Sequence, residues 1–502
     1  MAELTRRQLL AAAGVAGVAG AAALGGCSRG AKPVAATSAA VDRAEEARRT
    51  AGARTVTARL IAQPATVDLG GVMVDTWAYG DTVPGPLLRA RAGDLLRVDV
   101  SNRLPATTSV HFHGVALRND MDGVPGVTQD PIGRGATFRY EFTVPDPGTY
   151  FFHPHSGVQL DRGLYGVLVV DDPHEPGRYD DEWVVVLDDW IDGTGRSPDD
   201  VLTALVGAGG DAGSGSGHMG HDMSGMSGGM GGMGEAMTSP LLGGAGDVTY
   251  PHYLINGRVP AAPQTFTAKP GQRIRLRIVN AGSDTAFRVA LAGHQLTVTH
   301  SDGFSVVPAT TSALVVGMGE RYDVEVTLGE GVFVLVAAPE GKTGIARAVV
   351  RTGSGSVPSP STRPAELSGS ALLGTRLRAA PDVRLPARRV DRTHDLVLGG
   401  TMQPYRWTIN GTTFDDSKPL PVERGERVRL RFTNHSMMFH PMHVHGHTFE
   451  VADGARKDTV IVLPMSSVAV VLDATNPGQW MTHCHNIYHA ERGMMTTLSY
   501  RQ

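Results

Sequence analysis

The stretch GDLLRVDVSN, residues 93–102, occurs in three versions in this chain. Residues 271–280 read GQRIRLRIVN and residues 425–434 read GERVRLRFTN. Each version begins with Gly, alternates apolar with polar residues as a half-buried β-strand does, and ends at an Asn. A segment that recurs in this way indicates one β-domain repeated three times along the chain.

The rest of the sequence carries the same β pattern. Short runs of Val, Leu, Ile and Thr are broken by Gly, Pro, Asp and Asn, and no long helical period competes with them. A length of 502 residues, at about 100 to 200 residues per domain, leaves room for three domains. We therefore expect an all-β fold of three consecutive Greek-key β-sandwich domains. Their expected bounds are 54–173, 181–352 and 386–502.

Two stretches of low complexity separate or interrupt these domains. Residues 353–385, dense in Ser, Pro, Gly and Arg, are predicted to link the second domain to the third. Residues 207–247 are a Gly-rich insertion within the middle domain. The insertion contains methionines and histidines at short spacings: His218, Met219, His221, Met223, Met226, Met230, Met233 and Met237.

The N-terminus has the pattern of an export signal. Arg6 and Arg7 precede an apolar stretch rich in small residues and too short for a membrane span, an order that resembles the twin-arginine signal for folded proteins. LGGC at 24–27 resembles a bacterial lipobox, in which Cys27 becomes the lipid anchor. We expect a signal over 1–27, a spacer over 28–53 and a lipoprotein on the outer face of the cytoplasmic membrane. The alternative is a plain secretory leader with an incidental cysteine.

Charge and cysteine content narrow the classes of partner. A net charge of −4 gives no indication of a nucleic-acid partner. Membrane contact is expected only through the lipid anchor, and we expect a monomer. The chain has two cysteines, so if Cys27 is lipidated, Cys484 has no partner for a disulfide. Cys484 therefore needs another role.

Histidines occur in pairs far more often than chance allows. A random arrangement of 19 histidines would give roughly one His-x-His pair, whereas this chain has several, all in the first and third expected domains. Residues two apart in a strand project from the same face, so each pair offers two imidazoles side by side. The pairs are His111/His113, His153/His155, His443/His445, His445/His447 and His483/His485.

Cys484 lies between two of these histidines, and strand geometry gives that position a meaning. His483 and His485 can reach one metal cluster while the thiolate between them points the other way, into a second site. Two imidazoles, one thiolate and a weak axial Met are the blue-copper pattern, for which His440, His489 and Met494 are available. Structural zinc is the alternative, but a closed four-ligand site would leave most of the histidines unexplained.

Four blocks together resemble the multicopper oxidases over nearly all of the mature chain: HFHG at 111–114, HPHS at 153–156, HPMHVHGH at 440–447, and HCH at 483–485 followed by His489 and Met494. The resemblance implies cupredoxin-like domains, a copper-free middle domain, and one type 1, one type 2 and two type 3 copper ions. It implies type 1 ligands His440, Cys484, His489 and Met494, with Met495 as the alternative axial residue. It implies type 2 ligands His111 and His443, type 3 ligands His113, His153, His155, His445, His483 and His485, and a supporting role for His447.

The resemblance also implies electron transfer from a reducing substrate through Cys484 to dioxygen, which becomes water. Protons then need a donor, and Asp122 stands where the family places a carboxylate; a turn-forming Asp-Gly is the alternative. A second family acid is expected immediately before His489, but this chain has Tyr488 there. A phenol can shuttle a proton only in a suitable environment, so the second half of the relay is left to Tyr488, another acid or water.

The methionines bear on the substrate, because thioethers prefer Cu(I). We interpret the insertion as an arm that collects cuprous ions, with an inert insertion as the alternative. Met438 matches a position used by bacterial cuprous oxidases, although Ser436 stands where those enzymes carry an acid. We expect a cuprous oxidase that protects against copper. The rivals are a laccase-type oxidase of phenols and aromatic amines, and a non-catalytic copper-sequestering lipoprotein.

Overall fold

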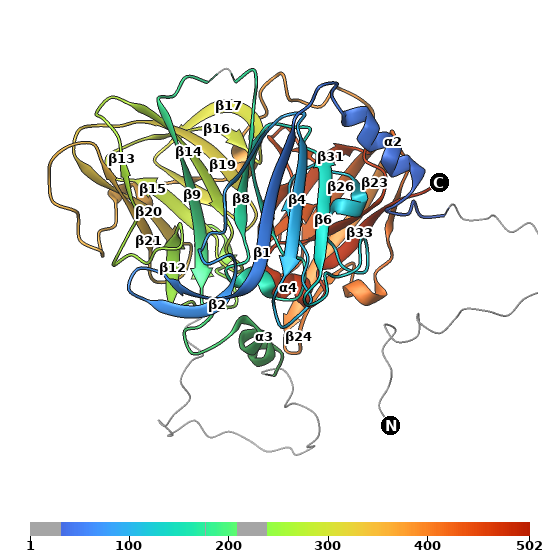
Figure 1. Cartoon of the computed structure of the whole chain (residues 1–502), viewed down its shortest axis with the longest axis horizontal. Helices are drawn as coiled ribbons and strands as arrows, with labels where there is room; N and C mark the ends of the chain where they lie inside the picture. Colours follow the sequence, from blue (N-terminus) through green and yellow to red (C-terminus); the bar gives the residue numbers. More distant parts are fainter. Residues whose placement is uncertain (1–31, 176, 208–237) are drawn as a thin grey trace, which may run out of the picture. The chain divides into compact units, whose positions relative to one another are not determined.

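A computed structural model describes residues 32–175, 177–207 and 238–502, and Pro33–Gln502 forms one compact unit. Six sheets of four to six strands make up three β-sandwiches that follow one another along the chain, so the predicted all-β fold is confirmed (Figure 1). None of the helices in the described ranges is long and apolar enough to span a bilayer.

The repeated segment occupies the same place in each sandwich. Its three versions are strands β4 (Leu95–Asn102), β14 (Arg273–Asn280) and β26 (Arg427–Asn434). Each pairs in parallel with the first strand of its domain and antiparallel with a later strand. The parallel partners are β1 (Thr55–Asp68), β9 (Asp181–Trp190) and β23 (Arg392–Met402); the antiparallel partners are β6 (Thr137–Thr143), β19 (Arg321–Thr327) and β31 (Ser467–Asp473).

The Asn that ends each version closes a buried turn. Asn280 Nδ2 donates to the carbonyls of Thr285 and Val316, both at 2.9 Å, and its Oδ1 accepts from the Gly282 amide at 2.9 Å. Asn102 and Asn434 make equivalent contacts with their own turns. A buried backbone group left without a partner is costly, which explains why the amide recurs.

The remaining strands complete the sheets. The first sandwich adds β2 (Met73–Tyr79), β3 (Leu88–Arg91), β5 (His111–His113), β7 (Gly148–His153) and β8 (Gly166–Asp171). The second adds β12 (His252–Ile255), β13 (Thr265–Thr267), β15 (Phe287–Leu291), β16 (Leu296–Ser301), β17 (Phe304–Thr311), β18 (Ala313–Val316), β20 (Val332–Pro339) and β21 (Ala346–Arg351). The third adds β24 (Tyr405–Ile409), β25 (Leu420–Val422), β27 (His440–Val444), β28 (Phe449–Val451), β29 (Arg456–Lys457), β30 (Thr459–Val462), β32 (Gln479–Cys484) and β33 (Met495–Tyr500). Short helices are α3 (Pro198–Gly207), α4 (Ile487–Glu491), η1 (Asn119–Met121), η2 (Gln159–Asp161), η3 (Ala365–Ser368), η4 (Gly374–Arg376) and η5 (Phe414–Asp416).

The described part of the predicted spacer is folded rather than extended. Helix α2 (Ala39–Arg48) buries Val41, Ala44 and Glu45. The Glu45 carboxylate accepts from the Thr143 amide and hydroxyl, both at 2.8 Å, which joins the helix to the first sandwich. Because its composition is rich in Ala, Arg and Glu, the helix has few apolar residues that could have indicated its buried face.

The predicted linker and insertion also contribute structure. Within 353–385, strand β22 (Ala371–Leu372) pairs in parallel with β18 and so extends a sheet of the middle domain. At the end of the insertion, β10 (Thr238–Ser239) and β11 (Gly243–Gly244) form a small antiparallel pair. Apolar side chains explain both cases, since Ala371 and Leu242 are buried.

We predict that Asn280→Ala destabilises the middle domain by about 1–3 kcal/mol, because the truncation leaves buried carbonyls and an amide without partners. Scanning calorimetry should show a lower melting temperature. Gln295→Ala, which truncates an exposed amide in the same domain, serves as the control and should shift the free energy of unfolding by less than about 0.5 kcal/mol. Equal melting temperatures for the two variants would contradict a structural role for the repeated Asn.

Candidate copper centres

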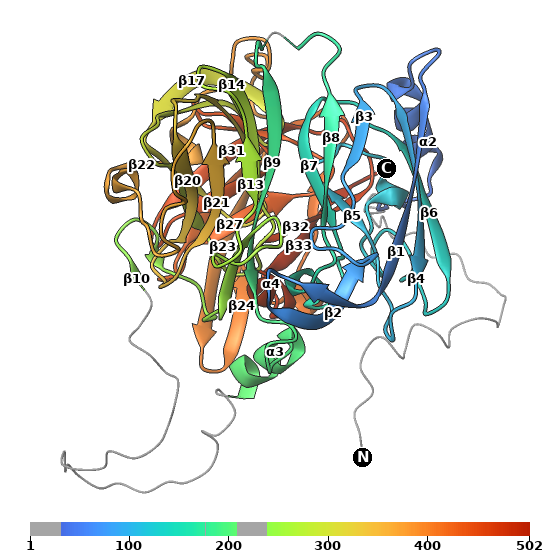
Figure 2. The ribbon, with the colours of Figure 1, turned by 60° about the vertical axis from the view of Figure 1, so that its left-hand side comes forward.

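Two antiparallel strand pairs carry most of the predicted ligands. In the first sandwich His111 on β5 lies opposite His153 on β7, and in the last sandwich His443 on β27 lies opposite His483 on β32. Because side chains alternate along a strand, the rings of each His-x-His motif point to one side. The two strand pairs lie near one another at the junction of the first and last sandwiches (Figure 2).

The rings gather into groups that combine the two sandwiches. Ligand-type atoms lie within 4.8 Å of one another in His111/His113/His443, in His113/His153/His485 and in His155/His445/His483. Each group takes at least one residue from the first sandwich and one from the last. The eight histidines therefore form one cluster between the domains, and neither domain holds it alone.

The outer nitrogen of most cluster rings is held by the protein. Four rings donate from Nδ1 to a backbone carbonyl at 2.8–2.9 Å. The pairs are His111 with Asp122, His153 with Pro154, His443 with Asp458, and His483 with Cys484. His445 Nδ1 donates to Asp122 Oδ2 at 2.9 Å. A ring held in this way keeps its other nitrogen unprotonated and fixed in direction, as a metal ligand requires.

The inner ring nitrogens of the cluster are arranged to bind a cation. Within residues 32–175, 177–207 and 238–502, His111 Nε2, His113 Nδ1, His153 Nε2, His443 Nε2 and both ring nitrogens of His485 are buried without a hydrogen-bond partner. His445 Nε2 and His483 Nε2 lie 3.0 Å apart, although the other nitrogen of each ring already carries the proton. Two acceptors at that distance are stabilised by a cation that both bind.

Burial keeps the rings neutral. Removal from water lowers the pKa of His113, His153, His445, His483 and His485 far below the usual histidine value. Neighbouring imidazoles lower it further, since two charged rings at such distances repel. A neutral imidazole is the form that binds a metal.

A second site lies inside the last sandwich. His440 Nδ1 and His489 Nδ1 are 3.1 Å apart, and each is 3.6 Å from Cys484 Sγ. All three side chains are buried, and burial raises the pKa of the Cys484 thiol. Cys484 faces inward because it lies next to His483, which faces the cluster.

The register of the last hairpin separates the two candidate axial methionines. Met495 lies opposite His483, so its side chain belongs to the face of the cluster. Met494 is fully buried, and its backbone accepts from the Cys484 amide at 3.1 Å and donates to the His489 carbonyl at 3.0 Å. Met494 is therefore tied to two residues of the second site.

Comparison with known proteins gives the family. Multicopper oxidase family models match residues 61–175, 235–355 and 390–502. The chain is 52% identical to the multicopper oxidase MmcO of Mycobacterium tuberculosis over 97% of this chain and 95% of that one. The chain belongs to the multicopper oxidase family. It is also 31% identical to a copper resistance protein A homolog of Pseudomonas syringae, over 82% of this chain and 87% of that protein.

Solved multicopper oxidase structures share the fold. A multicopper oxidase from Pseudomonas thermotolerans superposes with a TM-score of 0.68 at 27% identity, covering 89% of this chain and all 100% of that one. The laccase of Botrytis aclada superposes with a TM-score of 0.72 at 23% identity, covering 95% and 93%. Copper is thus the cofactor of this oxidase, and thiolate with neutral imidazole is a donor set that suits it.

The two residues expected to handle protons lie in different surroundings. Asp122 is fully buried, with Oδ2 on His445 Nδ1 and Oδ1 3.3 Å from His111 Nδ1, and burial raises its pKa. Tyr488 instead donates from its hydroxyl to Asp161. Asp122 thus joins histidines of two domains, whereas Tyr488 is committed to another contact.

Sequence reasoning on this multicopper oxidase missed Asp458 and Asp247, which contact proposed ligands, and Arg321, which binds Asp458. Asp458 Oδ1 is 3.1 Å from His113 Nε2, and Arg321 of the middle domain binds that carboxylate. Asp247 Oδ2 accepts from His489 Nε2 at 2.9 Å. None of the three stands in a His or Cys motif, so the sequence carried no local signal for them.

The other predicted residues divide into described and undescribed positions. His447 uses both ring nitrogens, on the His445 carbonyl at 3.0 Å and the Tyr500 hydroxyl at 2.6 Å, which suits the supporting role expected for it. Met438 lies against Gly244, where a β-carbon would collide with its sulfur. Cys27 and the insertion residues His218, Met219, His221, Met223, Met226, Met230, Met233 and Met237 lie outside the described residues.

We predict that Cys484→Ser abolishes the blue absorbance and substrate oxidation but leaves copper in the cluster, because the thiolate faces only the site inside the last sandwich. Optical and electron paramagnetic resonance spectra with a copper assay measure both effects. Thr482→Ser, two residues earlier on β32, should keep the blue colour. Blue absorbance that survives in Cys484→Ser would refute the assignment.

Proposed function

We propose that this multicopper oxidase oxidises Cu(I) to Cu(II) in copper detoxification. The proposed type 1 ligands are His440, Cys484 and His489 with axial Met494. The proposed type 2 ligands are His111 and His443, and the type 3 pair is held by His113/His153/His485 and by His155/His445/His483. Bound copper supplies one-electron transfer at the first site and four-electron reduction of dioxygen to water at the cluster.

The chain itself supplies the path between the two sites. Cys484 is bonded through the backbone to His483 and His485, so its sulfur is only a few covalent bonds from two cluster rings. His483 Nδ1 also donates to the Cys484 carbonyl at 2.8 Å. These contacts hold the thiolate and both imidazoles in fixed relative positions, which electron transfer without rearrangement requires.

Three exposed thioethers on the last sandwich, which also holds the proposed type 1 site, favour Cu(I) as the substrate. Met437 is 69% exposed, Met465 is 66% exposed and Met402 is 48% exposed. Gly243 lies against both Pro464 and the Met437 carbonyl, and Met402 pairs with Tyr405, whose hydroxyl donates to Asp247. Single exposed apolar residues are ordinary. Three exposed thioethers on one domain suit a soft cation, since thioethers prefer Cu(I).

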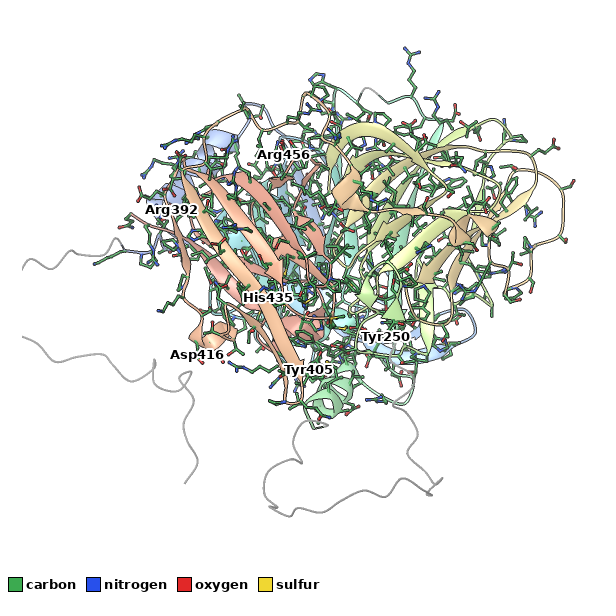
Figure 3. The ribbon with its side chains drawn as sticks, turned by 180° about the vertical axis from the view of Figure 1, so that it is seen from behind. Tyr250, Arg392, Tyr405, Asp416, His435 and Arg456 are labelled. Carbon is green, nitrogen blue, oxygen red and sulfur yellow. The ribbon has the colours of Figure 1, made fainter. Side chains whose placement is uncertain are left out.

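Asp247 adds a negative charge at the proposed type 1 site, because its carboxylate contacts His489. Burial opposes its ionisation, but His489 and the Tyr405 hydroxyl hold its pKa below the usual value. Tyr405 of the last domain, labelled in Figure 3, makes this contact with Asp247, which lies three residues before Tyr250 of the middle domain, also labelled there. A carboxylate on His489 favours a cation as electron donor over a neutral phenol.

The insertion strengthens the same proposal. Its last residues, from β10 to Asp247, lead directly to the type 1 edge. The methionines and histidines that precede them would raise the local concentration of Cu(I) there. The similarity to MmcO and to copper resistance protein A homologues agrees with a role in copper handling.

Two rival functions have specific weaknesses. Laccases are also among the relatives, at 25–28% identity, so phenol oxidation is retained as a side activity. Mere sequestration of copper needs no cluster of eight histidines in which most rings have one nitrogen fixed by the protein. We further propose export by the twin-arginine pathway and anchoring through Cys27, on the strength of the N-terminal motifs.

Asp122 is the proposed proton donor, and we predict that Asp122→Asn slows reoxidation by dioxygen about 100-fold or more with copper content unchanged. An amide oxygen can still accept from His445 Nδ1, but the side chain no longer exchanges a carboxyl proton. Stopped-flow recovery of the blue absorbance after mixing reduced enzyme with dioxygen measures the rate. Asp120→Asn, on the neighbouring 3-10 helix η1, is the control. A wild-type rate in Asp122→Asn would move the relay elsewhere.

The cuprous assignment predicts that replacing Met402, Met437 and Met465 together by Leu raises the KM for Cu(I) about tenfold, which is roughly 1.4 kcal/mol of binding. Leucine conserves volume but removes the sulfur. The kcat/KM for a phenol should stay unchanged. Steady-state oxygen uptake with each substrate provides the measurement.

Two further variants complete that experiment. Met73→Leu is the matched control, because Met73 is 62% exposed but lies on β2 of the first sandwich. Deletion of residues 213–236 removes the arm and spares Thr238, which pairs with Gly244. The deletion should also raise the KM for Cu(I). Unaltered Cu(I) kinetics in both the triple variant and the deletion would leave laccase as the better description.

A further inference from the structure

The middle domain contacts the cluster, although none of its described histidines belongs to it. Gly319, in the turn between β18 and β19, is so close that a β-carbon there would lie 2.7 Å from His485 Cδ2 and 3.0 Å from His113 Cε1. Two residues later, Arg321 is fully buried. The turn 317–321 therefore forms one wall of the cluster.

Arg321 spans all three domains with its guanidinium. Nη1 and Nη2 donate to the two carboxylate oxygens of Asp458 at 2.7 and 2.6 Å, and Nε donates to the Thr149 carbonyl at 3.1 Å. Thr149 belongs to the first sandwich and Asp458 to the last. This planar two-point contact fixes the orientation of the carboxylate, which a point charge would not do.

Asp458 in turn contacts two cluster rings and fixes their orientation. Its Oδ1 is 3.1 Å from His113 Nε2, and its backbone carbonyl accepts from His443 Nδ1 at 2.9 Å. The hydroxyl of Thr459 lies 3.1 Å from the same nitrogens of both rings and donates to Asp458 Oδ1. The rings of His113 and His443 stack at 3.7 Å.

His113 depends on this contact more than its neighbours do. His111, His153 and His443 are held at Nδ1 and leave Nε2 free, but His113 is held at Nε2 and leaves Nδ1 free. A ring turned over would present the wrong nitrogen. Asp458 is the anion that selects the orientation of His113, and Arg321 is the cation that holds Asp458 in place.

We propose that Arg321 is a positioning residue through which the copper-free middle domain controls copper loading at the trinuclear cluster. Without the guanidinium, the buried Asp458 carboxylate loses this two-point partner and turns toward other donors. His113 and His443 then lose their fixed direction. Contacts of this kind typically contribute 10–100-fold to metal affinity. The inference rests on the ligand assignments proposed above.

The test is Arg321→Met in the full-length enzyme reconstituted with copper. We expect cluster copper to bind at least tenfold more weakly, seen as loss of the type 2 electron paramagnetic resonance signal, with the blue absorbance of the type 1 site unchanged. Arg321→Lys keeps the charge but not the planar pair of donors and should lie between wild type and Arg321→Met. The control is Arg288→Met, which breaks a similar two-point pair with Glu340 elsewhere in the middle domain.

A double variant separates positioning from packing. In Arg321→Met/Asp458→Asn the unpaired charge is gone and the amide oxygen can still accept from His113, so the type 2 signal should recover. Recovery would not follow if Arg321 only filled space. Full type 2 loading in Arg321→Met, parallel loss of blue and type 2 signals, or no rescue in the double variant would each overturn the inference. A wild-type enzyme without a type 2 signal would instead refute the ligand assignments.

Discussion

Eight imidazoles clustered between two domains, seven of them buried, are the constraint on which the rest of this structure depends. Each ring has to be neutral, to keep one nitrogen free and to point that nitrogen inward, and burial alone secures only the first condition. The outer contacts secure the others, and they come mainly from backbone carbonyls such as those of Asp122 and Asp458. The alternation of side chains along each strand then decides the face of the sheet from which each ring projects. The β-sandwiches thus serve chiefly to fix the orientation of these side chains.

The sequence could reveal whatever depends on neighbours along the chain. The repeated Asn, the His-x-His spacing and the position of Cys484 are all local, and they led to three sandwiches and to the set of ligand histidines that the fold brings together. Strand alternation even indicated that Cys484 and His483 face opposite sides. The division of the type 3 histidines into His113/His153/His485 and His155/His445/His483 needs the packing of one domain on another, which no spacing contains.

Residues that act across domains stayed hidden for the same reason. Asp458 and Arg321 are 137 positions apart, and Asp247 and His489 are 242 apart. An isolated Asp or Arg in a β-rich sequence is far more often a solvated side chain than a partner of a ligand. Composition also gave no sign of α2 within 32–53 or of β22 within 353–385, because these polar, Ala-rich or Pro-rich stretches contain few of the apolar residues that dock the two elements.

The division of the cluster between β5 and β7 at one end of the chain and β27 and β32 at the other also governs when it can exist. During synthesis His111 leaves the ribosome more than 370 residues before His485, so the first sandwich can fold while its imidazoles still lack their counterparts. Pro33 forms a β-bridge with Arg501, and the Val34 amide donates to the Tyr500 carbonyl. The segment at Pro33 and Val34 can therefore make its native contacts only after residues 500 and 501 have been synthesised. Assembly of the cluster is therefore an event of the finished polypeptide, and a nascent or truncated chain would expose unpaired histidines to whatever metal it met first.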